Sequence, residues 1–119
     1  MTAPAIAPIC PAHAIPAVLI DDGAIYGRSF GRLWRCPVTG CDRRVGAHPD
    51  GSPKGTLADE PTRQARMRAH AAFDGWWRQA RISRGTAYRR LAADLGIREA
   101  HIGEMSVEQC ERVIALYRE

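Results

Sequence analysis

Two short pairs of metal-ligand residues in the first third of the chain constrain its fold more than any other feature. Cys10-Pro-Ala-His13 places a thiol and an imidazole three residues apart, and Cys36-Pro-Val-Thr-Gly-Cys41 places two thiols five residues apart. Each spacing lets a tight turn direct two side chains at one point, and the residues between the pairs suffice for a hairpin that brings the turns together. Thiolate and imidazole ligands favour zinc over calcium or magnesium. The sequence therefore predicts one tetrahedral zinc site made by Cys10, His13, Cys36 and Cys41.

Four protein ligands leave no coordination position for water, so the predicted zinc is structural rather than catalytic. The fourth ligand has an alternative, because His48 lies just beyond the second pair. The sequence favours His13, whose pairing with Cys10 matches the first ligand turn of a zinc ribbon. A simpler interpretation is that these residues are unrelated and that Cys10 and His13 lie in a loose tail. Cys110 falls on the apolar face of a predicted helix, which indicates a buried core residue.

The size of the chain supports a metal-dependent fold. At 119 residues it is one small domain or two small modules, and its first third is poor in large apolar residues. Three clustered cysteines suit metal ligation better than a disulfide framework. The N-terminus lacks the charge and the apolar run of a signal peptide, and the apolar run 14–20 is shorter than the roughly 20 residues of a membrane span. We therefore expect a cytoplasmic protein.

Local patterns divide the chain into four segments. Residues 1–8 are rich in Ala and Pro and are predicted to be disordered. Residues 9–48 form the predicted zinc ribbon, with Asp22-Gly23 as a hairpin turn. Residues 49–58 contain two prolines and two glycines and are predicted to be a connecting loop. The predicted strands cover 17–21, 24–26, 33–36 and 43–45.

Residues 59–119 have a helical period and predict three helices. Asp59 or Thr62 can cap the first, whose predicted apolar face consists of Ala65, Ala69, Ala72, Phe73, Trp76 and Ala80. Ser83 and Gly96 bound the second. Ser106 and Gln109 form a capping-box pattern at the start of the third. The predicted fold class is α+β, with an N-terminal zinc ribbon (a small antiparallel sheet) packed on a C-terminal three-helix region.

The charge pattern suggests a polyanionic partner. The net charge is +4, and between Arg63 and Arg90 the single acidic residue is Asp74. Arginine and aromatic residues alternate in the ribbon, where aromatic rings could stack on bases and arginines could contact phosphates. We therefore predict nucleic-acid binding, to DNA more than RNA, through Arg28, Arg32, Trp34, Arg35, Arg43, Arg44, Arg81 and Arg84. Tyr26 and Phe30 are further candidates for stacking, and other helix arginines for phosphate contact. The alternative is that the aromatic residues pack the ribbon and the arginines are solvated.

Two other function classes remain open at this stage. Trp76 and Trp77 are adjacent and diverge by about 100° on a helix, so either one is exposed for docking on a host protein or both are buried. For an enzyme, His70 and Asp74 lie four residues apart, and His48 and His101 fall in predicted loops. The chain shows no Ser/His/Asp order, no paired carboxylates and no second metal cluster. We therefore expect a protein that is not an enzyme and has no small-molecule substrate.

The chain resembles a bacteriophage and prophage family described as a zinc-finger-containing domain, which has no assigned biochemical function. The resemblance covers residues 9–115 and rests on several motifs: Cys10-x2-His13, Trp34-x-Cys36-x4-Cys41, Val45-Gly46-x-His48, Gly55-Thr-Leu-Ala58, Arg66-x3-His70-x2-Phe73-Asp74, Ser83-Arg84-x2-Ala87-Tyr88 and His101-Ile-Gly103. The family pattern has Cys-Pro-x-Cys at its first turn, so His13 departs from it while keeping a competent ligand. The ribbon is also similar to the zinc ribbons of bacterial type I topoisomerases, which bind single-stranded DNA. The resemblance implies a phage-type accessory protein of the bacterial host cell.

Overall fold

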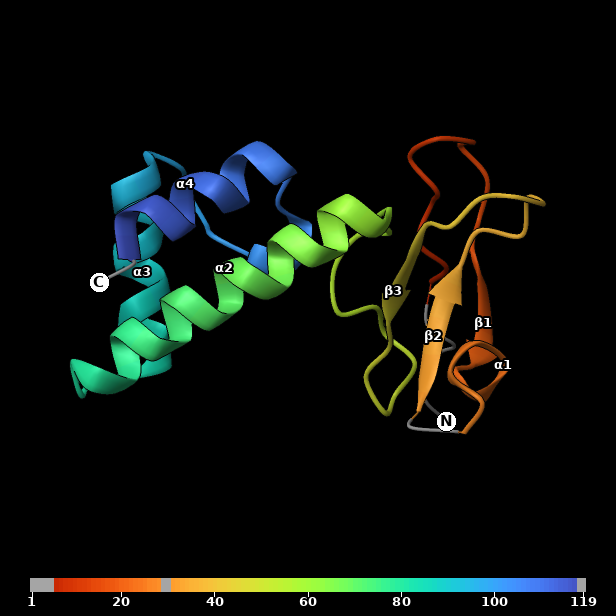
Figure 1. Cartoon of the computed structure of the whole chain (residues 1–119), viewed down its shortest axis with the longest axis horizontal. Coiled ribbons are helices and arrows are strands. Elements are labelled where there is room, and N and C mark those ends of the chain that lie inside the picture. Colours follow the sequence, from red (N-terminus) through yellow and green to blue (C-terminus); the bar gives the residue numbers. More distant parts are fainter. Residues whose placement is uncertain (1–5, 29–30, 118–119) are drawn as a thin grey trace. The chain divides into compact units, whose positions relative to one another are not determined.

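A computed structural model describes residues 6–28 and 31–117 of the chain. Contacts within the chain divide it into two compact units, and the boundary between them falls between Glu60 and Pro61. A three-stranded antiparallel sheet lies in the first, the zinc unit, and the main helices lie in the second, the helical unit (Figure 1). The predicted α+β fold class is confirmed. No helix among the described residues is long and apolar enough to cross a membrane.

The sheet has the strand order β1 (Val18–Asp21), β2 (Arg32–Arg35) and β3 (Arg44–Gly46). Both pairings are antiparallel, and Trp34 is the register partner of Leu19 on one side and of Val45 on the other. Because side chains alternate along a strand, these three residues share one face of the sheet. That face covers a small core around buried Trp34, Cys10, Ala17, Cys36 and Leu57.

The predicted hairpin at Asp22-Gly23 and the predicted strand over 24–26 are wrong. The chain instead forms a single helical turn, α1 (Gly23–Tyr26), closed by Gly27 at a φ of 80°. Asp22 is buried, and its carboxylate accepts a hydrogen bond from the backbone N–H of Gly31 at 3.2 Å. This carboxylate and the backbone bond from the Asp22 N–H to Gly31 O at 3.0 Å together close the β1–β2 connection, whereas a two-residue hairpin turn is closed by backbone bonds alone.

Segment 49–58 does more than connect the two units. It is irregular, as predicted, but Leu57 and Ala58 are buried, and Ala58 exchanges two backbone hydrogen bonds with Arg44 along the outer edge of β3. At the other end, Pro8 accepts a hydrogen bond from the N–H of Ala17 at 2.8 Å, and Ala7 packs against the core. The predicted disorder of residues 1–8 is therefore wrong for residues 7 and 8, while residues 1–5 lie outside the described part.

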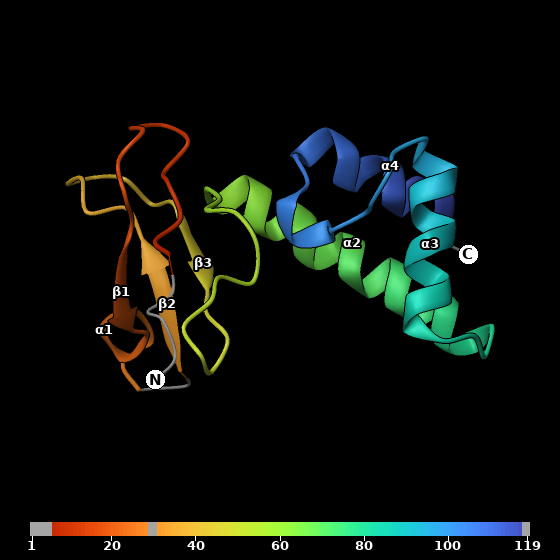
Figure 2. The same ribbon diagram turned by 180° about the vertical axis from the view of Figure 1, so that it is seen from behind.

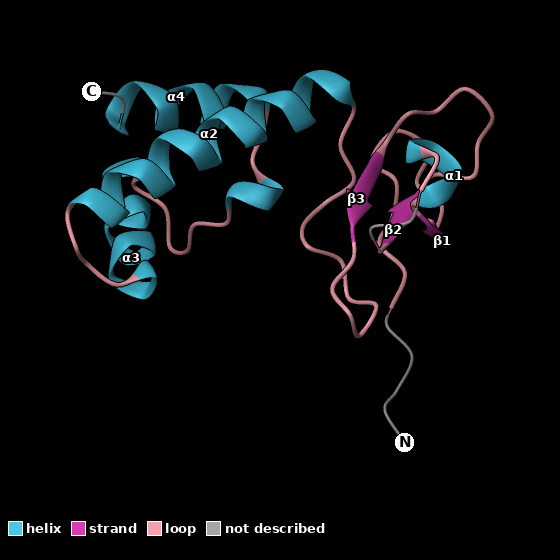
Figure 3. Ribbon diagram, turned by 60° about the horizontal axis from the view of Figure 1, so that its bottom comes forward, coloured by secondary structure: helices cyan, strands magenta, loops and turns pink. Residues whose placement is uncertain are grey.

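The helical unit contains α2 (Glu60–Gln79), α3 (Arg84–Leu95), a short 3₁₀ turn η1 (Ile102–Glu104) and α4 (Val107–Tyr117). Within this unit α4 runs beside α2 in views from both sides (Figures 1 and 2), and Figure 3 shows the loops that join its helices. The predicted boundaries of α3 and the predicted start of α4 are confirmed by their caps. The Ser83 hydroxyl accepts from the N–H of Thr86, and Gly96 ends α3 at a φ of 68°. Ser106 and Gln109 form the reciprocal pair of a capping box.

Phe73 is the centre of the helical core. Its fully buried ring makes edge contacts with Tyr88 at 4.9 Å and Tyr117 at 5.2 Å between ring centroids. Trp76 and Trp77 are both half-buried against this core. The prediction that one is exposed and the alternative that both are buried are therefore each only partly correct. The predicted inward position of Ala80 is wrong, since α2 ends at Gln79 and Ala80 is exposed.

Replacing Leu91 with alanine tests this core. The Leu91 side chain is fully buried, so Leu91→Ala should lower the free energy of unfolding by about 2–5 kcal/mol through lost burial and a residual cavity. Leu116→Ala is the matched control, because Leu116 is 47% exposed. Urea denaturation of both variants gives the comparison, and equal losses would contradict the assigned core.

Candidate metal centre

The first ligand turn is held by backbone hydrogen bonds on both sides of Cys10. The Cys10 N–H donates to Ile15 O at 2.9 Å, and the Ala14 N–H donates to Cys10 O at 2.8 Å. Ala14 adopts a φ of 57°, which reverses the chain immediately after His13. The turn therefore places the Cys10 thiol inward and keeps the His13 ring at the surface.

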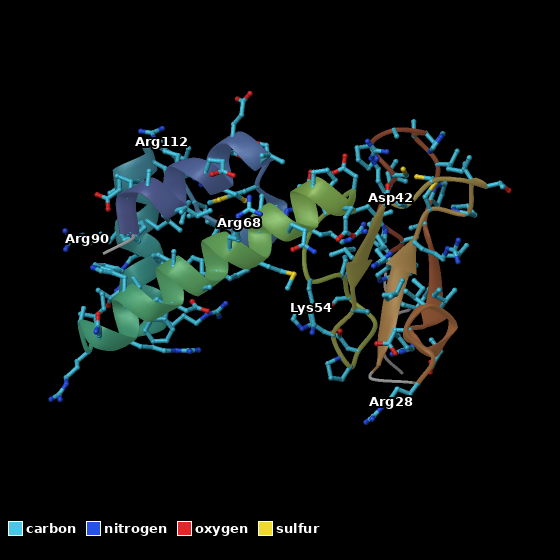
Figure 4. All side chains as sticks on the ribbon, viewed as in Figure 1. Arg28, Asp42, Lys54, Arg68, Arg90 and Arg112 are labelled. Atoms are coloured by element: carbon cyan, nitrogen blue, oxygen red, sulfur yellow. The ribbon has the colours of Figure 1, made fainter. Side chains whose placement is uncertain are left out.

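The second ligand turn begins at the end of β2. Cys36 follows Arg35 directly and its N–H donates to Arg43 O at 3.1 Å, so the sheet positions the first thiol of this pair. The Cys41 N–H donates to Val38 O at 3.0 Å, and Gly40 takes a φ of 85° that returns the chain toward Cys36. The sulfur atoms of the zinc unit gather at this end, beside Asp42 (Figure 4).

The four predicted ligands meet at one point. Their ligand atoms all lie within 4.8 Å of one another. Cys10 Sγ is 3.9 Å from Cys41 Sγ and 3.7 Å from His13 Nδ1, and Cys36 Sγ is 3.5 Å from the same nitrogen. All four cysteines of the chain are free thiols, so the sulfur contacts are not disulfides.

These separations fit a zinc ion. With Zn–S bonds of about 2.3 Å and Zn–N bonds of about 2.1 Å, a regular tetrahedron has S···S edges of about 3.8 Å and S···N edges of about 3.6 Å. The observed edges of 3.9, 3.7 and 3.5 Å agree with that geometry. The site therefore suits one structural zinc, with Nδ1 as the imidazole ligand atom.

His48 and Cys110 lie outside this cluster. The His48 side chain is exposed, and the alternative of His48 as the fourth ligand is not supported by the geometry. Cys110 is fully buried in the helical core, as predicted, where burial raises the pKa of its thiol. Neither residue completes a second cluster of ligands within the described residues.

A second layer of polar contacts supports the Cys41 sulfur. The backbone N–H of Arg43 is the main influence that lowers the pKa of the Cys41 thiol, which favours the thiolate that zinc needs. The Arg43 side chain also lowers the pKa of this thiol, and its guanidinium lies 3.7 Å from the Asp59 carboxylate. Cys36 differs, since burial raises the pKa of its thiol, and its ionisation depends more on the metal itself. Arg43 is thus a metal-supporting residue, a role that its position two residues after Cys41 could have suggested.

Comparison with known protein families shows the family to which the chain belongs. A family described as a zinc-finger-containing domain matches residues 6–119. The chain belongs to this family. Comparison with curated proteins and with solved structures gives no match. Family membership and the Cys/His cluster together establish this zinc-finger-containing protein as a zinc-binding one.

The structure separates the residues predicted to bind nucleic acid. Trp34 is only 6% exposed, and its indole N–H donates to Gly51 O at 2.8 Å, so the prediction that its ring stacks on bases is wrong. Phe30 and the side chain of Tyr26 lie outside the described residues. Arg43 is half-buried beside the metal ligands. Arg44 is also half-buried. The other predicted arginines are exposed: Arg28, Arg32, Arg35, Arg81 and Arg84.

Ligand substitutions test the metal assignment. Cys36→Ala should strongly reduce the amount of bound zinc, because it removes one of three thiolates and leaves a coordination position that only water can fill. His13→Cys should retain zinc, since a thiolate replaces the imidazole, and His48→Ala should leave zinc unchanged. Native mass spectrometry gives the stoichiometry of each variant. Loss of zinc from His48→Ala together with its retention in His13→Ala would overturn the assignment.

Substitution of Arg43 tests the second layer. Arg43→Gln should weaken zinc binding about tenfold, the lower end of the effect expected when a group that supports a ligand is removed from a partly exposed site. Arg28→Gln is the charge-matched control. Competition with a chromogenic chelator measures both affinities, and an Arg43→Gln variant equal to the control would show that its contact with Cys41 contributes nothing.

Proposed function

We propose that the protein binds nucleic acid through a basic face of the zinc-held sheet, and that the zinc stabilises this face without taking part in chemistry. The observation that carries the proposal is the gathering of cations on the sheet surface opposite Trp34. Arg35 and Arg44 are register partners across β2 and β3, and strand alternation puts both on that surface. Lys54 joins them from the following loop. We call Arg35, Arg44 and Lys54 the basic face.

Lys54 is a member that the charge pattern alone did not indicate. Gly46 lies next to Arg44 along this side of the sheet, and a Cβ added at Gly46 would meet Lys54 Cδ at 3.4 Å. The lysine stem therefore crosses β3 where Gly46 leaves space, and the ammonium group reaches the solvent beside the sheet (Figure 4).

Arg35 and Arg44 are like charges on neighbouring strands, and Asp42 lines the same hollow as both. Like charges directly opposite each other on neighbouring strands destabilise a sheet. Arg35 and Arg44 occupy such a pair. A phosphate backbone suits such a set of cations, since its charges are spaced for contact with several of them and counterions are released on binding. Because phosphate contacts carry no sequence information, we propose binding with little sequence preference.

The closed metal site favours a binding role over catalysis, because four protein ligands leave no position for a reacting water. His70 and Asp74, the pair considered for catalysis, both lie on α2, where their side chains interact with the rest of the helical unit. Asp74 accepts from the Trp77 indole N–H at 2.8 Å, and burial lowers the pKa of His70. We therefore propose a non-enzymatic, phage-type accessory protein that acts in the cytoplasm of a bacterial host.

Docking on a host protein is the second candidate. The observation that favours it is a groove of about 650 Å³ in the helical unit, with an apolar lining that includes Ala72, Trp76 and Tyr117. Capture of a host protein that survives nuclease treatment would support this candidate, and capture that is lost with nuclease would support nucleic-acid binding instead.

Salt-dependent titration tests the proposed function. Fluorescence anisotropy with single-stranded and duplex oligonucleotides at two salt concentrations should show binding that weakens as salt rises. The double variant Arg35→Gln/Lys54→Gln should bind at least tenfold more weakly. Its slope of log affinity against log salt should fall by about 1.4 on single strands or 1.8 on duplex, the loss of two phosphate contacts.

The control variant must remove the same charge elsewhere. Arg68→Gln/Arg112→Gln does so on α2 and α4, where Arg68 is already paired with Glu111 at 2.9 Å (Figure 4). This variant should keep nearly all of the affinity. No binding by the unmodified protein at low salt, or equal losses in both double variants, would refute the proposed role of the basic face.

A further inference from the structure

The helical unit contains a cavity that neither the zinc site nor the basic face uses. It has a volume of about 370 Å³, at the small end of the roughly 300–1,000 Å³ typical of ligand pockets. One wall is a face of α3 between Arg84 and Ala92, and the other is the segment that follows the helix. Arg84, Tyr88 and Arg89 line the cavity from the helix, and Arg98, Glu99 and His101 line it from the following segment.

Three guanidinium groups line this cavity. Arg84 lies over the Tyr88 ring at 5.0 Å, which fixes the plane of its guanidinium. Arg89 donates to the Thr86 hydroxyl at 3.1 Å, which holds its side chain along the helix. Within the described residues, none of Arg84, Arg89 and Arg98 forms an ion pair with a carboxylate.

The acidic groups near the cavity are already engaged. Glu99, the acidic residue in the lining, lies 3.0 Å from His101 Nε2. Asp74 acts electrostatically on Tyr88 from α2, and its carboxylate accepts from the Trp77 indole. The cavity therefore gathers three cations with one acid in its lining, and their mutual repulsion favours a ligand with more than one negative charge.

We propose that this cavity binds a phosphate monoester carried by a nucleotide. Guanidinium groups match the oxygen geometry of phosphate through paired N–H donors. A monoester carries about −1.5 to −2 charges at neutral pH, which suits three arginines better than the single charge of a backbone diester. The volume exceeds the needs of the phosphate alone, and buried Ala92 and Ala100 form an apolar part of the wall against which the rest of the nucleotide packs.

The monoester has two possible sources, a free mononucleotide or the phosphorylated end of a nucleic-acid strand. Only the second source rests on the function proposed above. In that case the cavity holds the phosphorylated end of a nucleic-acid strand. The strand-end source therefore predicts a preference for 5′-phosphorylated over 5′-hydroxyl strands that persists when the basic face is altered.

Calorimetric titration of the full-length zinc-bound protein tests the cavity with adenosine 5′-monophosphate, adenosine and inorganic phosphate as probes. The monophosphate should bind saturably, at least tenfold more tightly than adenosine. The variant Arg89→Gln/Arg98→Gln should weaken this binding at least tenfold, and the charge-matched Arg68→Gln/Arg112→Gln should not. Equal affinity for monophosphate and adenosine, or no difference between the two double variants, would overturn the proposal.

A second variant keeps the test independent of folding. Gly85 is exposed in the first turn of α3, and a Cβ added there meets only Arg89 Nη1 at 3.7 Å, an ordinary contact. Gly85→Glu is therefore accommodated, and an acidic residue in the first helical turn is favourable. It places a carboxylate beside the cavity, so monophosphate affinity should fall at least tenfold with an unchanged melting temperature. Unchanged affinity in this folded variant would also overturn the proposal.

Oligonucleotide arms identify the source. A tenfold preference for 5′-phosphorylated over 5′-hydroxyl single strands, abolished by Gly85→Glu, assigns the cavity to strand ends. Equal binding of both strands alongside tight monophosphate binding assigns it to free nucleotides. If Arg35→Gln/Lys54→Gln leaves strand affinity unchanged while the monophosphate still binds, the basic-face function fails and the cavity proposal stands.

Discussion

The closure of one tetrahedral site by two chain turns is the constraint on which the zinc unit depends. Its sheet has strands of four, four and three residues, and the core that they cover is built around Trp34 and two of the ligands themselves. So small a core contributes little stability. Structural zinc supplies about 10–16 kcal/mol in small zinc-finger peptides, which exceeds what a core of this size provides. The metal site and the short strands thus stabilise each other, since Cys36 directly follows the end of β2.

The helical unit has no such dependence on a metal. Its core contains Phe73, Leu91, Ile102 and Val113, all nearly or fully buried, and α3 begins and ends at its own caps. Tyr117 donates from its hydroxyl to Asp94 at 2.6 Å, so even a polar group at the margin of this core is satisfied. The chain therefore joins two units with different sources of stability, coordination in one and apolar burial in the other.

The division has a consequence for function. A structural zinc with four protein ligands supplies no reactivity, and its contribution is to fix the surfaces around it. The sheet turns Trp34 toward the core and turns Arg35 and Arg44 to the opposite side, so the same alternation builds the stabilising face and the basic face. In the helical unit, Arg84 and Arg89 stand on the side of α3 that lines the cavity rather than on the side that packs on Phe73. In both proposed sites, the arginines therefore lie on the side of their strand or helix that does not pack into the core.

The sequence by itself determined the features that depend on local spacing. These include the Cys10–His13 and Cys36–Cys41 ligand pairs, the caps at Ser83 and Ser106, and the apolar stripe through Ala65, Ala69 and Phe73. Tertiary structure alone decided the rest, because burial is a property of what covers a residue. Trp34 is buried in the core of the zinc unit and donates to Gly51 O, and buried Asp22 accepts from Gly31, so both contacts join residues that lie apart in the chain. Likewise, Arg98 reaches the side of Arg89 only after the chain has turned back from α3, and no pattern within either segment records that approach.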